Sequence, residues 1–358
     1  MIHAAPSAAD DAHPTGAVTR AAPDRRSVLA ALLASAALHG TAFAAGADEA
    51  DPFDPVAAAG AALDQLHSIT IVHRGETRFA RRFAGPPLDR AANVKSVSKS
   101  IVALLTGIAV DRGIIPGTEA TLGELAPGLV PDAADPRVKD ITVADLLTMQ
   151  AGLEGTSGPN YGPWVQSADW VRFALTRPMV AAPGEAFQYS TGTYHVLGAV
   201  LAETGGASLL ALARDWLGDP LGITIPAWTR DPQGRYLGGN NMALTPAAMA
   251  RIGEMVRLNG EVDGSRVVSE EWISRALTPV TRSPFSGDAY GLGWFLRDFG
   301  GAAAAYARGF GGQMIYVVPA LELTVAVTSD PTRPARTGGH VGDLNRLLED
   351  DIIPALDA

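Results

Sequence analysis

The stretch Asn93-Val94-Lys95-Ser96-Val97-Ser98-Lys99-Ser100 opens the most apolar helical segment of this 358-residue chain. The apolar positions that follow recur at helical spacing, namely Ile101, Leu104, Leu105, Ile108 and Ala109. Gly113 then stands where a helix typically ends. The pattern predicts a buried helix over residues 96–111, with a serine at its first position.

Ser96 and Lys99 are three residues apart, so on this helix they share one face, with Cβ atoms ~5–6 Å apart. The free N–H groups and the positive end of the helix dipole at Ser96 favour a developing anion. Burial of Lys99 would disfavour its charged form, and a neutral amine can take a proton from a serine hydroxyl. With 17 serines and three lysines in the chain, about 0.14 such pairs are expected by chance. The alternative is a capping serine beside a surface lysine.

Two later segments add chemistry of a similar kind. Tyr189, in Phe187-Gln188-Tyr189-Ser190-Thr191-Gly192, can relay a proton, although a buried structural tyrosine explains it equally well. The glycine-rich run Ala307-Arg308-Gly309-Phe310-Gly311-Gly312-Gln313 lets backbone approach a ligand and could supply an oxyanion N–H. Such runs are also common in plain hairpins.

The rest of the chain predicts an α+β fold. Two strands are expected at 69–74 and 77–83, and further strands at 291–297, 303–308, 313–318 and 321–328. These segments can form one antiparallel sheet flanked by helices at 57–67 and 342–348. We therefore expect a discontinuous α/β lobe from residues 57–113 and 266–358, and a mostly helical insertion lobe at 114–265.

Composition excludes several classes of protein. The net charge is −10, from 28 Lys and Arg against 38 Asp and Glu, so no basic surface for nucleic acid is expected. Without cysteine there are no disulfides, thiolate nucleophiles or Cys-ligated metals. His-Glu-x-x-His, phosphate-loop and dinucleotide patterns are absent from the sequence, so no metal or cofactor is implied. The oligomeric state stays open.

The first 44 residues are typical of an export signal. Arg25-Arg26 precede a short apolar run over 28–38, which ends at the small-x-small pattern Ala42-Phe43-Ala44. The paired arginines favour the twin-arginine route of bacteria, and hence a periplasmic or secreted protein. The alternative is a membrane anchor, but the run is short for a bilayer. The acidic segment 45–56 is expected to be a linker, and no membrane span is expected in the mature chain.

These motifs resemble those of the penicillin-recognising serine hydrolases in order and approximate spacing. The resemblance extends from about Leu63 to Leu348 and is closest to the branch related to class C β-lactamases, with its esterases and 6-aminohexanoate-oligomer hydrolases. It rests on the three motifs above and on four flanking segments, 93–100, 141–153, 238–242 and 290–294. It implies a β-lactamase/transpeptidase-like fold, an antiparallel sheet flanked by helices with a mostly helical insertion lobe.

The resemblance also implies a role for each matching residue. Ser96 would be the acylated nucleophile, Lys99 its base partner and Tyr189 the proton relay. The backbone N–H groups of Ser96 and Phe310 would form the oxyanion hole. Thr191 and Gly309 would contact the substrate, and no cofactor would be needed.

The sequence departs from the family pattern at two positions. Thr191 stands where the second motif commonly has Asn, so an amide that can hold a substrate carbonyl is lost. Ala307 stands where the third motif commonly has Lys or His, a cation that holds a substrate carboxylate. Arg308 is adjacent but should face the opposite way on a strand. These departures argue against efficient β-lactam hydrolysis and favour carboxylate-free substrates such as short acyl esters.

The sequence allows alternative roles for several aromatic residues and for the whole protein. Trp164, with Tyr161 and Trp170, either walls an acyl pocket or packs in the core. His195 fits a packed histidine better than a catalytic one. The main hypothesis is an exported serine hydrolase that cleaves a small ester or amide through an acyl-enzyme at Ser96. The alternative is a weakly catalytic, penicillin-binding-like sensor or scaffold module.

Overall fold

A computed structural model describes residues 51–356 of the chain. The predicted signal peptide, 1–44, and the first part of the predicted linker lie outside the described residues. The described residues form one compact unit. Among the described residues, no single helix has the length and hydropathy to cross a membrane. One pair of helical segments bent by 85°, Thr191–Thr204 and Leu209–Leu221, would meet that criterion together.

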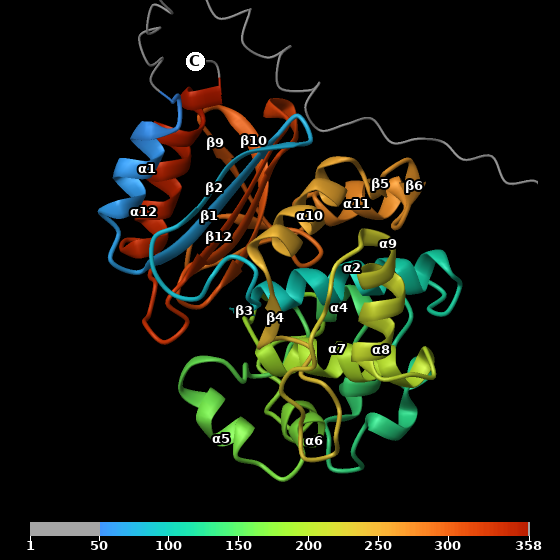
Figure 1. Ribbon diagram of the computed structural model, residues 1–358. Coiled ribbons are helices and arrows are strands. Elements are labelled where there is room, and N and C mark those ends of the chain that lie inside the picture. Colours follow the sequence, from blue (N-terminus) through green and yellow to red (C-terminus); the bar gives the residue numbers. More distant parts are fainter. Residues whose placement is uncertain (1–50, 357–358) are drawn as a thin grey trace, which may run out of the picture. The chain divides into compact units, whose positions relative to one another are not determined.

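An eight-stranded antiparallel sheet forms one side of this unit (Figure 1). Its strands, in sheet order, are β2 (Glu76–Arg82), β1 (Leu66–His73), β12 (Leu323–Ser329), β11 (Gln313–Val318), β10 (Ala302–Gly309), β9 (Phe295–Phe299), β8 (Ala289–Tyr290) and β7 (Thr281–Arg282). The central strands β11 and β12 are buried throughout, as expected for strands covered on both faces. The edge strand β2 is largely exposed and carries Arg78, Arg81 and Arg82, charges that discourage edge-to-edge pairing.

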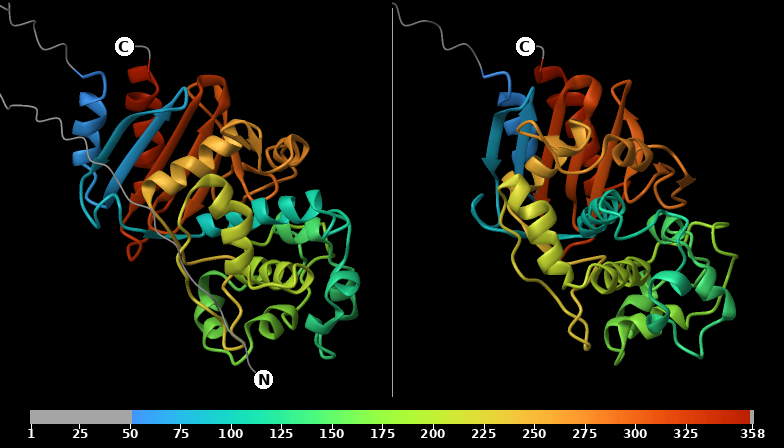
Figure 2. Two further views of the ribbon diagram at one scale, coloured as in Figure 1. Left: turned by 45° about the vertical axis from the view of Figure 1, so that its right-hand side comes forward. Right: turned by 90° about the vertical axis from the view of Figure 1, so that its right-hand side faces the viewer.

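Helices cover both faces of the sheet (Figures 1 and 2). On one face lie α1 (Asp54–Ala61) and α12 (His340–Arg346), which continues into a further helical turn, Leu347–Ile352. On the other face lie α10 (Pro246–Arg257) and α11 (Glu270–Ala276). Helix α10 packs directly on the sheet, where the Thr324 hydroxyl donates to Glu254 at 2.6 Å.

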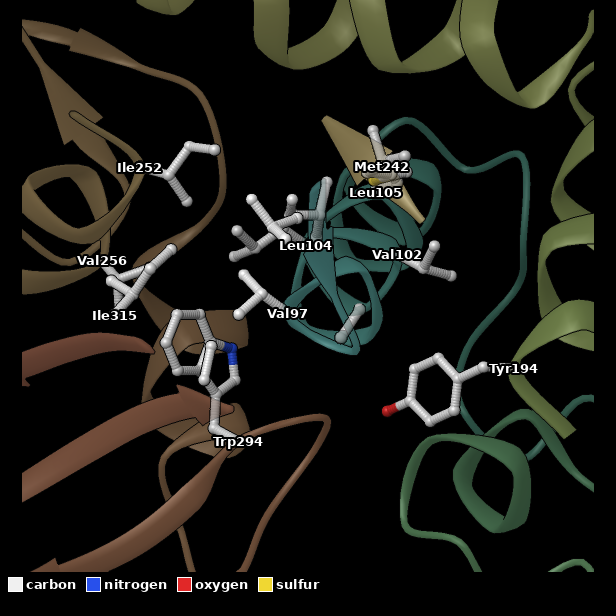
Figure 3. Packing of buried hydrophobic residues seen from close by; sticks show 14 of the residues in the cluster. Val97, Val102, Leu104, Leu105, Tyr194, Met242, Ile252, Val256, Trp294 and Ile315 are labelled. Atoms are coloured by element: carbon white, nitrogen blue, oxygen red, sulfur yellow. The ribbon is translucent and has the colours of Figure 1, made fainter. Parts of the chain in front are cut away.

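Helix α2 (Val97–Asp111) lies between the sheet side and the remaining helices, and it is buried almost along its whole length. Figure 3 shows Val97 and Leu104 on the side toward Ile252 and Val256 of α10, whereas Tyr194 of α7 lies on the other side. All five side chains are nearly inaccessible to solvent. A helix buried on both sides joins the sheet and the helical segments in one hydrophobic core.

The remaining elements are mostly short helices. They are α3 (Leu122–Leu125), α4 (Val143–Leu147), α5 (Tyr161–Val165), α6 (Trp170–Leu175), α7 (Thr191–Thr204), α8 (Leu209–Ala213) and α9 (Asp219–Leu221). Strand β3 (Ala92–Lys95) leads into α2 and pairs with β4 (Met242–Leu244) in a two-stranded ribbon. A small hairpin, β5 (Glu261–Val262) with β6 (Ser265–Arg266), follows α10.

The α+β class and the flanked antiparallel sheet are confirmed. Local limits differ: α1 begins at Asp54, inside the predicted linker, because Pro55 suits the first turn of a helix. Strand β9 begins at Phe295 rather than 291, since 291–294 form a glycine-containing turn. Helix α10 lies in the segment assigned to the helical lobe, yet its apolar face packs on the sheet. The division into two lobes stays a prediction.

Candidate active site

Ser96 lies where the chain turns from β3 into α2, and its side chain is partly exposed. Lys95 before it has a left-handed backbone, with φ at 51°, which is strained for any residue other than glycine. Two hydrogen bonds hold this turn. The Lys95 N–H donates to Asn93 Oδ1 at 2.9 Å, and Ser98 Oγ donates to the Lys95 carbonyl at 2.6 Å. The strained turn thus presents Ser96 at the N-terminus of a buried helix.

Lys99 lies one turn into α2 and is 2% exposed. Its Nζ is 3.0 Å from Ser96 Oγ, 3.2 Å from Thr191 Oγ1 and 2.5 Å from the Gly239 carbonyl oxygen. Burial lowers the pKa of Lys99 from 10.5 to about 7. A neutral amine has two N–H donors and one lone pair. With both donors directed to Gly239 and Thr191, the lone pair can accept the proton of the Ser96 hydroxyl.

Tyr189 contacts the same two side chains from the loop before α7. Its ring lies 5.0 Å from Lys99 Nζ, and its phenol interacts with the Ser96 side chain. Burial raises the pKa of Tyr189 above 10.0, while the Ser96 contact and the charge of Arg308 act in the opposite direction. The phenol therefore keeps its proton at neutral pH and is a donor.

The turn after β10 comes close to β3. A Cβ on Gly309 would lie 2.3 Å from the Val94 carbonyl oxygen, so only glycine allows this approach. Within residues 51–356, the backbone N–H groups of Ser96 and Phe310 donate no hydrogen bond. Unpartnered backbone N–H groups are the kind of donor that a developing oxyanion requires. The Phe310 side chain is 50% exposed.

Gln313, the residue that ends the turn after β10, connects this turn to β12 through its side chain. The Gln313 amide donates to the Ser329 carbonyl at 2.7 Å and accepts from the Ser329 N–H at 3.1 Å. Ser329 Oγ is 2.9 Å from His340 Nε2 and donates to the Gly312 carbonyl at 3.1 Å. The turn carrying Phe310 is therefore attached to Ser329 of β12, which is in turn in contact with His340 of α12.

The two departures from the family pattern have clear structural consequences. Thr191 is 3% exposed, and its hydroxyl interacts with Lys99 and with Ser157 Oγ at 3.1 Å. Thr191 therefore holds Lys99 in place. Its side chain exposes too little surface for the direct contact with substrate that the resemblance implies. Ala307 is 1% exposed and supplies no cation. Arg308 donates to Ala335 O and Thr337 Oγ1 at 3.0 and 3.1 Å.

Trp164 has no accessible surface, and we correct its assignment as a substrate-binding residue. Its indole N–H donates to the Trp170 carbonyl at 2.9 Å, and the two rings are in contact. Trp164 is the buried residue of α5, so core packing prevails over pocket lining. Its neighbour Tyr161 is only partly buried, and its hydroxyl accepts from Asn240 Nδ2 at 3.0 Å.

Sequence reasoning missed the Gly239 carbonyl, although Gly238-Gly239 was among the segments that carried the resemblance. A carbonyl leaves no signal in residue type, but two successive glycines indicate close backbone approach. Among the described residues, no group of three or more His, Asp or Glu side chains could hold a metal ion.

Known proteins share this architecture. A model of the family described as Beta-lactamase matches residues 55–348, which is most of the chain. Together with the β-lactamase/transpeptidase-like fold, this defines a serine hydrolase. The chain belongs to the Beta-lactamase family.

Several solved structures have the same fold. A family VIII carboxylesterase is 19% identical, with a TM-score of 0.67 over 85% of this chain and 98% of its own. A penicillin-binding protein homologue from Caulobacter crescentus is 18% identical, with a TM-score of 0.68 over 85% and 98%. A D-stereospecific amidohydrolase from Streptomyces sp. is 16% identical, with a TM-score of 0.61 over 77% and 93%.

Proposed function

We propose that this hydrolase cleaves an ester or amide bond through an acyl-enzyme formed on Ser96. The observation that carries the proposal is the 3.0 Å contact between Ser96 Oγ and Lys99 Nζ, an amine whose pKa burial lowers to about 7. A base titrating near neutral pH serves both as proton acceptor and as proton donor. Ser96, Lys99 and Tyr189 belong to one contact set, as the family resemblance implies.

In the acylation half-reaction, Ser96 Oγ bonds to the substrate carbonyl carbon and its proton passes to Lys99 Nζ. The carbonyl π electrons move to oxygen, where the N–H groups of Ser96 and Phe310 stabilise the charge. As the bond to the leaving group breaks, the Tyr189 phenol protonates the leaving oxygen or nitrogen. Lys99 then returns its proton to Tyr189, so both side chains regain their starting state.

Deacylation repeats these steps with water. A water molecule bonds to the acyl carbon and loses its proton to Lys99, and the oxyanion forms again in the same place. The bond to Ser96 Oγ then breaks, the serine takes the proton back, and a carboxylic acid leaves. The net reaction adds one water across the ester or amide.

The substrate class follows from what the site lacks. Ala307 replaces the usual cation of the third motif, and the guanidinium of Arg308 is already hydrogen-bonded to residues 335 and 337. We propose an uncharged ester or amide, with short acyl esters first, and little β-lactam hydrolysis. A carboxylesterase and an amidohydrolase among the similar structures agree with this class.

The alternative is a sensor that is acylated once and then stalls, which the altered second and third motifs favour. Thr191 keeps the contact with Lys99, and this supports turnover instead.

We also propose export by the twin-arginine route, on the evidence of Arg25-Arg26 and the Ala42-Phe43-Ala44 pattern. Intact mass of the protein recovered from a periplasmic fraction tests this, and a retained N-terminus there contradicts it.

Multiple-turnover kinetics on a panel of short-chain esters, anilides and a β-lactam tests the proposed function. We expect steady turnover of an uncharged ester, lost in Ser96→Ala and kept in Ser274→Ala, an exposed serine on α11. A single burst of product followed by no turnover would instead establish the sensor. Equal turnover in Ser96→Ala would remove Ser96 from the reaction.

A further inference from the structure

A second group of buried polar side chains lies behind the site, on the face of α7 that carries Thr191. His195 follows Thr191 by four residues, so the two side chains share that face. Thr191 contacts Lys99, whereas the function proposed above gives His195 no role. His195 is fully buried, and its ring lies 5.9 and 5.7 Å from the rings of Trp164 and Trp170.

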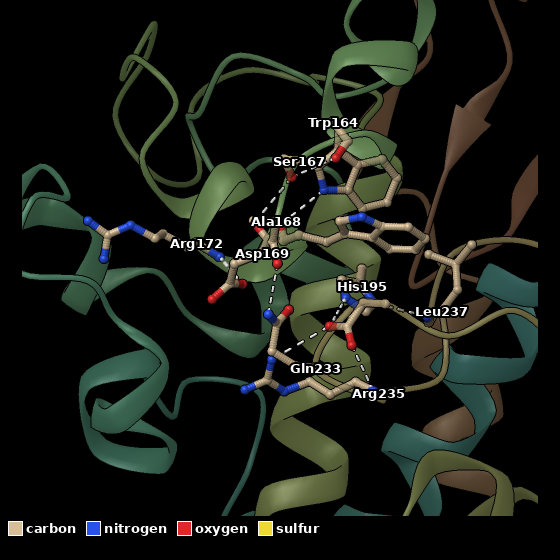
Figure 4. Close-up of polar contacts among 12 residues, drawn as sticks. Trp164, Ser167, Ala168, Asp169, Arg172, His195, Gln233, Arg235 and Leu237 are labelled. Atoms are coloured by element: carbon tan, nitrogen blue, oxygen red, sulfur yellow. Dashed lines mark hydrogen bonds and ion pairs between the residues drawn. The ribbon is translucent and has the colours of Figure 1, made fainter.

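Both ring nitrogens of His195 bind one hairpin, residues 228–239 (Figure 4). The Gly238 N–H donates to His195 Nδ1 at 3.4 Å, and His195 Nε2 lies 3.1 Å from Asp231 Oδ2. A backbone N–H can only donate, so Nδ1 is the acceptor and Nε2 carries the proton given to Asp231. The imidazole therefore fastens the hairpin to α7 at two points.

Asp231 in turn organises the hairpin itself. Its Oδ1 accepts from the Arg235 N–H at 2.7 Å, and Arg235 Nη1 lies 3.5 Å from Oδ2. Burial acts to raise the pKa of Asp231, but the contacts with His195 and Arg235 outweigh it, and the net pKa is lowered. The carboxylate thus stays ionised and binds the turn and the histidine at once.

The hairpin ends on the carbonyl that holds Lys99. Gly239 follows Gly238, and a Cβ on Gly239 would lie 2.7 Å from the Thr191 carbonyl oxygen. The backbone here crosses the first turn of α7 in direct contact. The Gly239 carbonyl then accepts from Lys99 Nζ at 2.5 Å. Asp231 contacts His195, His195 contacts Gly238, and the next residue, Gly239, contacts Lys99.

We propose that His195 and Asp231 form a buried positioning pair, which holds the Gly239 carbonyl against Lys99 and keeps the amine dry and directed at Ser96. The proposal rests on the function proposed for Ser96 and Lys99. His195 touches no reacting atom, so it is a positioning residue.

The expected consequence concerns the proton of Lys99. The Tyr189 ring lies 5.0 Å from that amine, and Tyr189 is coupled electrostatically to the phenols of Tyr194 and Tyr290 and to the charge of Arg308. Burial raises the pKa of all three phenols, so they stay uncharged near neutral pH. When the hairpin loosens, water reaches Lys99, its desolvation is relieved, and its pKa rises from about 7 toward 10.5.

The test is the rate at which a fluorophosphonate probe labels Ser96, measured against pH in the full chain. For His195→Gln, which removes the acceptor for Gly238, we expect a loss of about 10- to 100-fold at pH 7. We also expect the midpoint of the rising limb to move to higher pH. His195→Asn, which keeps an oxygen near the position of Nδ1, should shift the midpoint less. If His195→Gln does not fold, Asp231→Asn gives the same readout, because it keeps the shape of the side chain.

Tyr316→Phe is the matched control, since it removes a buried hydrogen bond, to Asn345 Oδ1 at 2.9 Å, away from Lys99. It should lower the melting temperature and leave the midpoint unchanged. Folded His195 and Asp231 variants with the wild-type rate and midpoint would overturn the positioning pair. Wild-type protein unlabelled at every pH would instead overturn the function proposed for Ser96.

Discussion

The burial of one lysine determines the chemistry that this site can perform. Lys99 is enclosed by the helix that carries it, by the Gly239 carbonyl and by Thr191, and the cost of burying an ammonium lowers its pKa to about 7. Half of the molecules then hold a neutral amine near pH 7. An ordinary surface lysine would be almost wholly protonated there and could accept nothing.

Activity should therefore rise with pH through that value. Below about 7 Lys99 holds its proton and cannot accept the one from Ser96, and above it the amine is free. We expect the rate of Ser96 labelling to increase along a one-proton curve between about pH 5 and about pH 9. Lys139→Met, at an exposed lysine, should leave the curve in place. A flat curve in the wild type would show that Lys99 is not the base.

Only part of the surroundings of Lys99 could be predicted from the sequence. The spacing of Ser96 and Lys99 places them together because a helix fixes its own geometry. Thr191 and Gly239 are 92 and 140 residues from Lys99 in the chain. Their contacts depend on how α7 and the 228–239 hairpin pack, which no local pattern encodes. The family motif indicated Thr191, whereas Gly238-Gly239 indicated close backbone approach without specifying the carbonyl or its partner.

Among the elements, the turn after β10 matters most for the site. Its closeness to β3 depends on Gly309, and β3 in turn leads into Ser96. In the sheet β10 pairs with β11 and β11 pairs with β12, and the contacts of Gln313 with Ser329 of β12 hold the turn there. The Phe310 N–H is therefore positioned by strands, which are more rigid than a free loop.

Gly309→Ala should separate these two elements. The added Cβ would lie 2.3 Å from the Val94 carbonyl, so β3 or the turn must move and the Phe310 N–H leaves the oxyanion. Loss of one oxyanion donor costs about 10²–10³ in turnover. Steady-state kinetics on the best ester measures this. Gly338→Ala, where the added Cβ meets nothing within 4 Å, is the control. Full activity in Gly309→Ala would contradict the assigned donor.

Long, strongly patterned elements were predictable, and short ones were not. The α2 helix and the strands β1, β10, β11 and β12 lie close to their predicted positions, because each has many residues of one pattern. Strands β3, β4, β7 and β8 have four residues or fewer, and they exist through their partners. The burial of Trp164 was equally undecidable, since an aromatic side chain suits a core and a pocket alike.

At the scale of the whole molecule, α2 serves both as the core of the fold and as the support of the site. Leu104 and Val97 pack toward α10, and the other side of the helix meets α7. The sheet and the helical segments should therefore unfold together, as one compact unit from residue 51 onward.

Leu104→Ala tests this coupling. Removal of a fully buried leucine should cost about 2–5 kcal/mol of unfolding free energy. Hydrogen exchange followed by mass spectrometry should show equal losses of protection in peptides from α7 and from β11. A loss confined to one of them would show two independently folding lobes. The midpoint of the pH curve for Ser96 should not move, because Leu104 is not among the partners of Lys99 Nζ, which are Ser96, Thr191 and Gly239.

The central claim is that Ser96 is an activated nucleophile. The most direct measurement is the intact mass of the protein after reaction with a fluorophosphonate probe, beside the Ser96→Ala variant. We expect a single adduct per chain in the wild type and none in folded Ser96→Ala. An adduct of equal yield in the variant, or none in the folded wild type, would contradict it.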